Sequence, residues 1–353
     1  MKVVGHDTWA VRIPYEEHRA ATHIVLRLNT DEGAQGVSYL TALVPWTVAP
    51  IRAAIDALME KVHGANPMAV ESINAVLLAR AVRPQFDGLV RSAVSLIDIA
   101  LWDLKAKALS QPLFRLLGGS TNRVPTHAAW KLFLRSPVDL KTLAKIGREH
   151  TARGFLAMKF HVAAVPTKAE AVAVTRVLRE AVGNDVELYV DMNWSRTVDS
   201  AIALGRELAP FDLSWIEDPI PPNDYDGLRQ ISEALETPIC AGETFHQALE
   251  FRSLLERRSV EVVMIDLEVG GITQWLKMAH LIETYRLPVT NHVTTEVSAH
   301  VIAAVNGLTV SYLPWAEPLF KEGLPVQDGQ LVLFERPGLG LELDPAALKK
   351  YAL

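Results

Sequence analysis

In the segment ELYVDMN (residues 187–193) a short apolar run ends at an acidic residue, Asp191. This pattern decides the fold of the chain because it recurs. The same pattern returns in LSWIEDP (213–219), where the apolar run ends at Glu217, and in PICAGE (238–243), which ends at Glu243. Helix-forming sequence separates the three segments. Each repeat is therefore predicted to be a strand followed by a helix, which is the βα unit of a parallel sheet.

Strand-like and helix-like segments keep alternating on both sides of this stretch, from about residue 124 onwards. Helices are predicted over 168–182 and 198–208, and further strands in FLAMKF (155–160), VVMIDLE (262–268), LPVTNH (287–292) and LTVSYLPW (308–315). So many βα units in series favour a closed barrel over an open sheet. We therefore predict an α/β barrel over residues 120–319.

The first 119 residues have a different pattern. Ile24, Leu26 and Leu28 alternate with Val25, Arg27 and Asn29, and turn sequence at 30–33 precedes a second predicted strand over 35–39. A helix with one apolar face follows over about 90–104, and the helical sequence stops near Gly118 and Gly119. Strands followed by helices predict an α+β domain over 1–119. The glycine-rich residues 320–353 are predicted to return to this domain as an irregular tail.

The composition is that of a globular protein with a substantial core. The chain has 353 residues, of which 49% are hydrophobic and 22% charged, enough for a barrel and a smaller domain. A net charge of −6 gives no electrostatic reason to expect nucleic acid or an anionic membrane as a partner. We find no signal-peptide pattern and no membrane-spanning run, and the single cysteine, Cys240, excludes an internal disulfide. We expect a cytoplasmic protein with a small-molecule partner.

Six polar residues end successive predicted strands at intervals of 23 to 26 residues. They are Asp191, Glu217, Glu243, Asp266, His292 and Glu317. Acidic residues also follow strands simply because loops are polar, but that explanation does not account for a nearly constant phase over six strands. Since the carboxyl ends of barrel strands meet at one mouth, where barrel active sites lie, we expect these side chains to share a site.

Asp191, Glu217 and Glu243 are predicted to hold a metal ion. Carboxylates from three adjacent strands would repel one another unless a cation lay among them. Oxygen ligands without cysteine suit Mg²⁺, or alternatively Mn²⁺.

Two further pairs are predicted to face the same mouth. Asp266 and His292 end consecutive strands, so that the carboxylate can fix the tautomer of the imidazole and raise its basicity. Lys159 and His161 lie two residues apart on one strand, and such residues point to the same face.

At these residues the sequence resembles the enolase superfamily, specifically its mandelate racemase subgroup, over nearly the whole chain. VDMNW (190–194), WIEDPIPP (215–222) and AGET (241–244) are similar to its three metal-ligand segments. MIDLEVGGIT (264–273) and NHVTTE (291–296) are similar to its aspartate–histidine dyad, and residues 97–119 to its join between capping domain and barrel. The resemblance implies a (β/α)7β TIM-type barrel with an N-terminal α+β capping domain completed by the C-terminal tail. It also implies Mg²⁺-dependent removal of the proton beside a substrate carboxylate, through an enediolate.

The resemblance further implies a role for each residue at the mouth. Lys159 would add positive charge near the substrate carboxylate, and Glu317, kept protonated, would donate a hydrogen bond from the other side. His292 would be the acid or base on one face, with His161 on the other. Many members of the subgroup have a second lysine where this chain has His161, so whether His161 is a base or a binding residue stays open.

Two reactions can follow from one enediolate. Loss of a β-hydroxyl converts a sugar acid into a 2-keto-3-deoxy acid, whereas reprotonation on the opposite face gives racemisation or epimerisation of a 2-hydroxy acid. Racemisation needs a competent acid on both faces, so dehydration asks for fewer assumptions and is the reaction we predict. A non-catalytic barrel that binds sugars or organic acids is a remote alternative, since it would need no metal triad.

Substrate selection is expected to fall to the capping domain, whose loops close over the barrel mouth in this family. The candidate substrate-binding residues are His18, Arg19, His23, Trp130, Asn193 and Trp315. Arg19 is able to pair with a second carboxylate, although the sequence leaves open whether the substrate is a mono- or dicarboxylate. Barrels of this family commonly self-associate, so the resemblance also implies a homo-oligomer.

Overall fold

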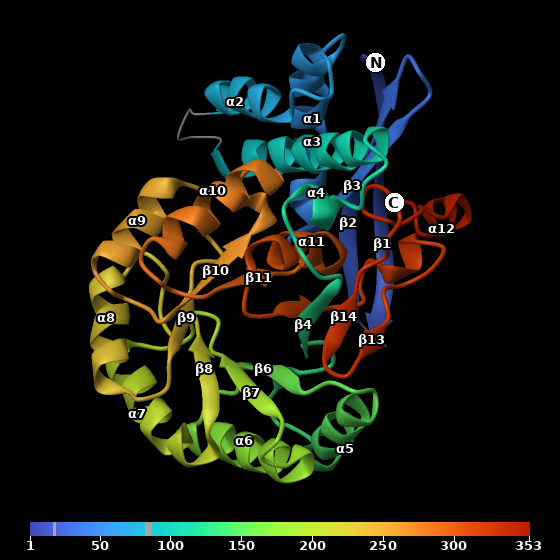
Figure 1. The fold of residues 1–353 in the computed structure, drawn as a ribbon. Coiled ribbons are helices and arrows are strands. Elements are labelled where there is room, and N and C mark those ends of the chain that lie inside the picture. The colour runs from blue at the N-terminus through green and yellow to red at the C-terminus, as the bar shows by residue number, and fades with distance from the viewer. Residues whose placement is uncertain (17–18, 82–86) are drawn as a thin grey trace.

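The computed structural model of the protein describes residues 1–16, 19–81 and 87–353 (Figure 1). Its N-terminal part is a three-stranded antiparallel sheet of β1 (Val3–Glu16), β2 (Arg19–Thr30) and β3 (Gln35–Ala42), in that order. The helices α1 (Val48–Val62), α2 (Val70–Ala81) and α3 (Asp87–Ala108) follow. The sheet is tied to α3 by Asp103, whose carboxylate accepts a hydrogen bond of 2.8 Å from the backbone of Val37. The apolar face predicted for this helix is buried, since Val94 and Ile97 have no exposed surface.

The second part is a closed barrel of parallel strands. Its strands are β4 (Arg123–Ala128), β6 (Ala157–Ala164), β7 (Glu187–Asp191), β8 (Leu213–Glu217), β9 (Ile239–Ala241), β10 (Val262–Asp266), β11 (Val289–His292) and β12 (Val310–Tyr312). β12 pairs in parallel with β4, and on its other side the backbone N–H of Ser311 donates to the Asn291 side chain of β11 at 3.1 Å, which closes the ring. Within the described ranges one helix joins each strand to the next, so the predicted (β/α)7β barrel with its capping domain is confirmed.

The helices between the barrel strands lie around the outside of the ring (Figure 1). They are α5 (Leu140–Ala152), α6 (Lys168–Val182), α7 (Val198–Leu208), α8 (Tyr225–Ala234), α9 (Ala248–Glu256), α10 (Gly271–Glu283) and α11 (Thr295–Val305). Two of them begin at the predicted residues because a threonine caps each. Thr167 accepts a hydrogen bond from the backbone of Glu170, and Thr197 forms a capping box with Ser200.

Aromatic side chains fill the barrel interior beneath the mouth. Tyr189 and Trp215 stack with ring centroids 3.6 Å apart, and His127 meets both rings edge-on. Cys240 is fully buried beside them, which agrees with a packing role for its thiol. This packed layer supports the polar residues that end the strands above it.

The tail touches both parts of the chain. β14 (Gln330–Val332) pairs antiparallel with β4 and with the short β13 (Val326–Gln327), and α12 (Pro345–Lys350) follows. The last residues reach β1, where the backbone N–H of Arg12 donates to Tyr351 at 2.8 Å. We keep the division into residues 1–119, 120–319 and 320–353 as a proposal. No helix in the described ranges combines the length and apolarity needed to cross a membrane.

Candidate active site

A cavity of about 700 Å³ opens where the carboxyl ends of the barrel strands face the capping sheet. Barrel residues on its wall include Lys159, His161, Asp191, Asn193, Glu243 and His292. Arg12 and Tyr15 of β1 and Arg19 of β2 line the cavity from the capping sheet. Predicted residues of both parts of the chain therefore meet in one open cavity.

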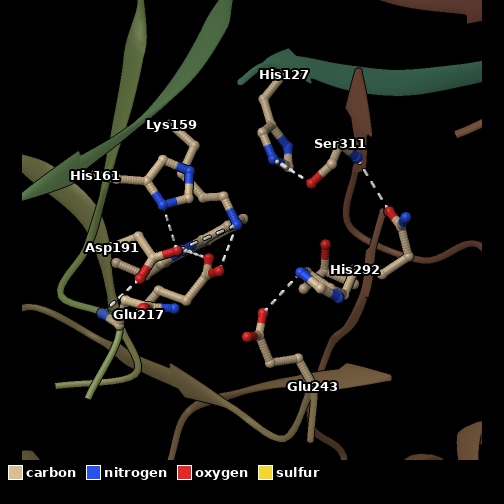
Figure 2. Close-up of polar contacts among 12 residues, drawn as sticks. His127, Lys159, His161, Asp191, Glu217, Glu243, His292 and Ser311 are labelled. Atoms are coloured by element: carbon tan, nitrogen blue, oxygen red, sulfur yellow. Dashed lines mark hydrogen bonds and ion pairs between the residues drawn. The ribbon is translucent and has the colours of Figure 1, made fainter. Parts of the chain in front are cut away.

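The register of the parallel strands brings the polar side chains together. His161 lies opposite Asp191 on β7, Asp191 opposite Glu217 on β8, and Asp266 opposite His292 on β11. Figure 2 shows Lys159, His161 and Asp191 pointing toward one another from adjacent strands. Asn193 lies just after β7, where its backbone N–H donates to Asp191 at 2.7 Å.

Lys159 is a buried cation held by two carboxylates. Its ammonium pairs with Glu217 and lies 3.9 Å from Oδ2 of Asp191, and the side chain is only 3% exposed. Burial alone would lower the pKa of Lys159, but the charges of Glu217 and Asp191 outweigh burial and raise it. Lys159 therefore stays charged beside the cavity.

His161 is oriented by a carboxylate and has one ring nitrogen available. Its Nδ1 lies 2.8 Å from Oδ2 of Asp191, and its ring stacks on Phe133 with centroids 4.0 Å apart. Its Nε2 is buried without a hydrogen-bond partner in the described part of the chain. Because His161 lines the cavity, this unpartnered nitrogen is able to exchange a proton with a molecule that reaches it.

His292 is oriented in the same way from the other side of the mouth. Its Nδ1 lies 2.6 Å from Oδ2 of Asp266, and its Nε2 lies 3.2 Å from Oε2 of Glu243 (Figure 2). Burial alone would lower the pKa of His292, but the carboxylates of Glu243 and Asp266 raise it to about 9. The imidazole is therefore protonated at neutral pH and can act as an acid.

The carboxylates at the mouth fit a divalent cation. Asp191, Glu217, Asp218 and Glu243 are all buried, and neither oxygen of Asp218 has a hydrogen-bond partner among the described residues. Burial and the charges of Glu243 and Glu217 raise the pKa of Asp218 well above its usual range. Oxygen donors with an excess of negative charge are what Mg²⁺ prefers.

In this structure two of the same carboxylates form ion pairs with cationic side chains of the protein. Across the described residues, no three acidic or histidine side chains stand in a ready metal-binding arrangement. Lys159 holds Glu217 and His292 holds Glu243, so a metal ion would compete with these contacts.

Glu317 does not end a barrel strand, contrary to the predicted spacing, and its catalytic role stays a prediction. It begins a short 3₁₀ turn (Glu317–Leu319), five residues after β12 ends at Tyr312, and it is absent from the described cavity wall. Its Oε2 accepts a hydrogen bond of 3.0 Å from the Tyr312 hydroxyl instead. Ser311 of β12 does line the cavity, as do Leu313 and Trp315 just after the strand.

Two predicted substrate-binding residues pack inside the protein and do not line the described cavity. His23 is fully buried, with Nε2 3.1 Å from the carbonyl oxygen of Trp315, and burial lowers its pKa to about 4. Trp130 is buried against His150, at 4.0 Å between ring centroids. Trp315 and Arg19 do line the cavity, as predicted, whereas His18 lies outside the described residues.

The structure also reveals a polar chain that the strand-end pattern missed. His127 on β4 lies with Nε2 2.8 Å from the Ser311 hydroxyl and Nδ1 3.2 Å from that of Thr309 (Figure 2). The Thr309 hydroxyl donates to Pro125, so it accepts from Nδ1–H, and Nε2 accepts from Ser311. Ser311 therefore presents an acceptor oxygen to the cavity.

The whole chain is similar to known proteins of one family. Residues 2–118 match the model of the mandelate racemase / muconate lactonizing enzyme N-terminal domain, and residues 142–347 match the enolase C-terminal domain-like model. The chain belongs to the mandelate racemase family of the enolase superfamily. The predicted resemblance is therefore confirmed.

Curated and solved members of the mandelate racemase family cover most of the chain. The L-talarate/galactarate dehydratase of Salmonella typhimurium is 32% identical, over 92% of this chain and 81% of its own. The D-xylonate dehydratase of Haloferax volcanii is also 32% identical, over 93% and 85%. The crystal structure of a racemase from Streptomyces coelicolor with bound magnesium superposes with a TM-score of 0.91 at 30% identity, covering 99% of this chain and 100% of that one.

Proposed function

We propose that this protein is a magnesium-dependent dehydratase that converts a sugar acid into a 2-keto-3-deoxy acid through an enediolate. The observation that carries the removal of the α-proton is the pair of carboxylate-oriented imidazoles, His161 and His292, in one cavity with the Lys159 ammonium. The dehydratase relatives from Salmonella typhimurium and Haloferax volcanii support the reaction class.

Asp191, Glu217 and Glu243 are the residues that would hold the magnesium ion. When bound, the ion supplies a Lewis acid that stabilises negative charge on the substrate carboxylate. Lys159 supports the same charge, because its buried ammonium stays positive next to these carboxylates.

Proton transfer would use the two histidines in different roles. His161 takes the proton from the carbon beside the carboxylate at Nε2, which has no other partner in the described structure. His292, which Asp266 orients through Nδ1, gives its proton to the β-hydroxyl as the carbon–oxygen bond breaks and water leaves. The resulting enol becomes the 2-keto-3-deoxy acid by protonation at carbon 3. Ser311 would accept a hydrogen bond from a substrate hydroxyl.

Racemisation or epimerisation is the second candidate. His161 is paired with Asp191 at 2.8 Å much as His292 is paired with Asp266 at 2.6 Å, so both sides of the site have an oriented imidazole. This symmetry, which the sequence did not predict, removes the main argument against a racemase. The racemase from Streptomyces coelicolor supports the same candidate.

Proton NMR in D₂O with Mg²⁺ and a panel of sugar acids and 2-hydroxy acids tests the proposal. For a dehydratase we expect the α-proton signal to disappear while a 3-deoxy methylene signal grows. Loss of the α-proton signal with an unchanged carbon skeleton would instead identify a racemase or epimerase. If no compound lost its α-proton, the catalytic proposal would be wrong. A cytoplasmic location and a homo-oligomeric state stay predictions.

A further inference from the structure

Three arginines line the cavity in addition to the catalytic groups. Arg12 comes from β1, Arg19 from β2, and Arg135 from β5 (Phe133–Arg135), a short strand that pairs with β6 just after the first barrel strand. Two of these residues therefore belong to the capping sheet and one to the barrel. None of them belongs to the proton-transfer site described above.

The positive charge of this group is only partly balanced. Arg12 and Arg135 are exposed, and in the described ranges no carboxylate lies within 4.0 Å of either guanidinium. Arg19 alone has an ion pair, at 3.5 Å from Oε2 of Glu16, and it also donates to the carbonyl oxygen of Phe133 at 3.2 Å. Among the described residues, the three guanidinium groups thus share a single ion-pair partner, the carboxylate of Glu16. An excess of arginine on a cavity wall suits an anion that is absent from the protein itself.

Tyr15 lies near two of the arginines, Arg19 and Arg135. Burial raises the pKa of its hydroxyl, and the positive charges of Arg19 and Arg135 oppose that shift, so both guanidinium groups lie near the hydroxyl. Tyr15 lines the cavity as well. Its hydroxyl adds a neutral donor to those of the arginines.

A row of aromatic rings separates the arginines from the catalytic end. Phe133 stacks on His161 at 4.0 Å, Trp315 lies 5.6 Å from Phe133, and Tyr15 stacks on Trp315 at 5.0 Å between ring centroids. The row thus runs from His161 to Tyr15, and Arg19 donates to the backbone of Phe133 within it. A ligand whose carboxylate lies at the catalytic end would extend along this wall before its far end met the arginines.

We propose that the cavity has a second anion subsite, formed by Arg12, Arg19 and Arg135 with the Tyr15 hydroxyl, and that it binds the distal carboxylate of a dicarboxylic sugar acid. The inference rests on the proposed function for the direction in which the substrate lies, with its reacting carboxylate next to Lys159. It narrows the substrate class to acids with a carboxylate at both ends. The guanidinium fork can accept a carboxylate through two parallel hydrogen bonds, which a terminal hydroxymethyl group cannot match.

Calorimetric titration with matched acids tests the subsite apart from turnover. The probes are galactarate against galactonate and glucarate against gluconate, which differ only in the terminal carboxylate, with Mg²⁺ present. The titrations use the His292→Asn background, so that a bound acid is not consumed. We expect at least one diacid to bind about 10- to 100-fold more tightly than its partner, as for a hydrogen-bonded charge pair.

Two substitutions test whether the arginines cause the preference for diacids over monoacids. Arg12→Gln and Arg135→Gln should each reduce it, because neither side chain has a described carboxylate partner whose loss would disturb the fold. Arg148→Gln is the matched control, an exposed arginine on α5 away from the cavity wall. Tighter binding of 6-phosphogluconate than of glucarate would assign the subsite to a phosphate and overturn the proposal.

Equal affinities within each pair, or a preference that survives in both arginine variants, would also overturn it. These results do not depend on catalysis. A diacid preference without turnover of any acid by the wild-type protein would support the subsite while contradicting the dehydratase proposal. Turnover of both diacids and monoacids, with equal affinities for the two, would support the dehydratase proposal while contradicting the subsite.

Discussion

Replacing Lys159 with methionine should destabilise the magnesium-free protein. The ammonium is 3% exposed and pairs with Glu217, which is fully buried, while Asp191 lies 3.9 Å away. Breaking a buried ion pair by removing one partner costs about 3–5 kcal/mol, because the remaining charge stays buried without compensation. Methionine keeps the length of the side chain and adds no new charge. We therefore expect a loss of unfolding free energy in this range at neutral pH.

Magnesium should restore part of this loss. An ion that binds only the folded protein stabilises it by about 2.7 kcal/mol at 100 times its dissociation constant. Without the positive charge of Lys159, the carboxylates of Asp191, Glu217 and Glu243 attract a cation more strongly. The stabilisation by magnesium should therefore be larger in the Lys159→Met variant than in the wild type.

The assay is urea unfolding of both proteins after treatment with EDTA, with and without added Mg²⁺. Lys145→Met is the control, since Lys145 is 74% exposed and its contact with Glu149 is a surface pair at 3.7 Å. Its unfolding free energy should change by less than about 1 kcal/mol. If Lys159→Met unfolded like the wild type without Mg²⁺, or gained no more than the wild type from Mg²⁺, the charge balance described for this site would be wrong.

Three further predictions concern single residues. Glu217→Gln should weaken Mg²⁺ binding at least about 10-fold in calorimetry, since even groups that only support metal ligands have effects of this size; unchanged affinity and turnover would remove Glu217 from the metal site. His292→Asn should lower turnover by about 10²- to 10⁴-fold in the NMR assay, and full activity would exclude it as the acid. Burial raises the pKa of Asp98 to about 7, so between pH 4 and 7 the folded state keeps a proton that the unfolded chain releases. As the pH rises from 4 to 7, the free energy of unfolding of the wild type should therefore fall by up to about 4 kcal/mol, and that of Asp98→Asn should not. The same change in unfolding free energy between pH 5 and 8 in both proteins, measured with urea, would contradict this.

The barrel and its catalytic end could be predicted from the sequence because the residue at which each strand ends is determined by the residues next to it in the chain. Asp191, Glu217 and Asp266 each stand at the last residue of a strand, so the apolar run before each one marks the strand end directly. Pairing in register then places neighbouring strand ends side by side. The positions of His161 and Lys159 follow from the two-residue period of a single strand.

The same rule failed where an apolar run continued past the end of a strand. LTVSYLPW suggests a strand that reaches Glu317, but pairing stops at Tyr312, and Glu317 begins a separate turn in which it accepts a hydrogen bond from the Tyr312 hydroxyl. The pattern of neighbouring residues also does not predict which polar and aromatic side chains become buried. His23 looks like a loop donor, yet its contacts with Thr41 and Trp315 are set by how the capping sheet meets the barrel.

The residues that select the substrate are the hardest to predict, because the cavity is closed by segments far apart in the chain. Arg12 and Arg135 are separated by 123 positions and carry no motif. Phe133 belongs to a three-residue strand that is too short for periodicity to indicate. Their common location follows only from docking of the capping sheet onto the barrel mouth.

The choice between dehydration and racemisation therefore depends on how the substrate is held as well as on the catalytic groups. Both imidazoles have an aspartate on Nδ1, so each can exchange a proton at Nε2. If His292 Nε2 faces the α-carbon, the site racemises, and if it faces the β-oxygen, the site dehydrates. Adjacent carbons in a sugar acid are only about 1.5 Å apart. A distal carboxylate bound by the arginines would fix the substrate along its length, and so would help to decide which of the two atoms His292 Nε2 meets.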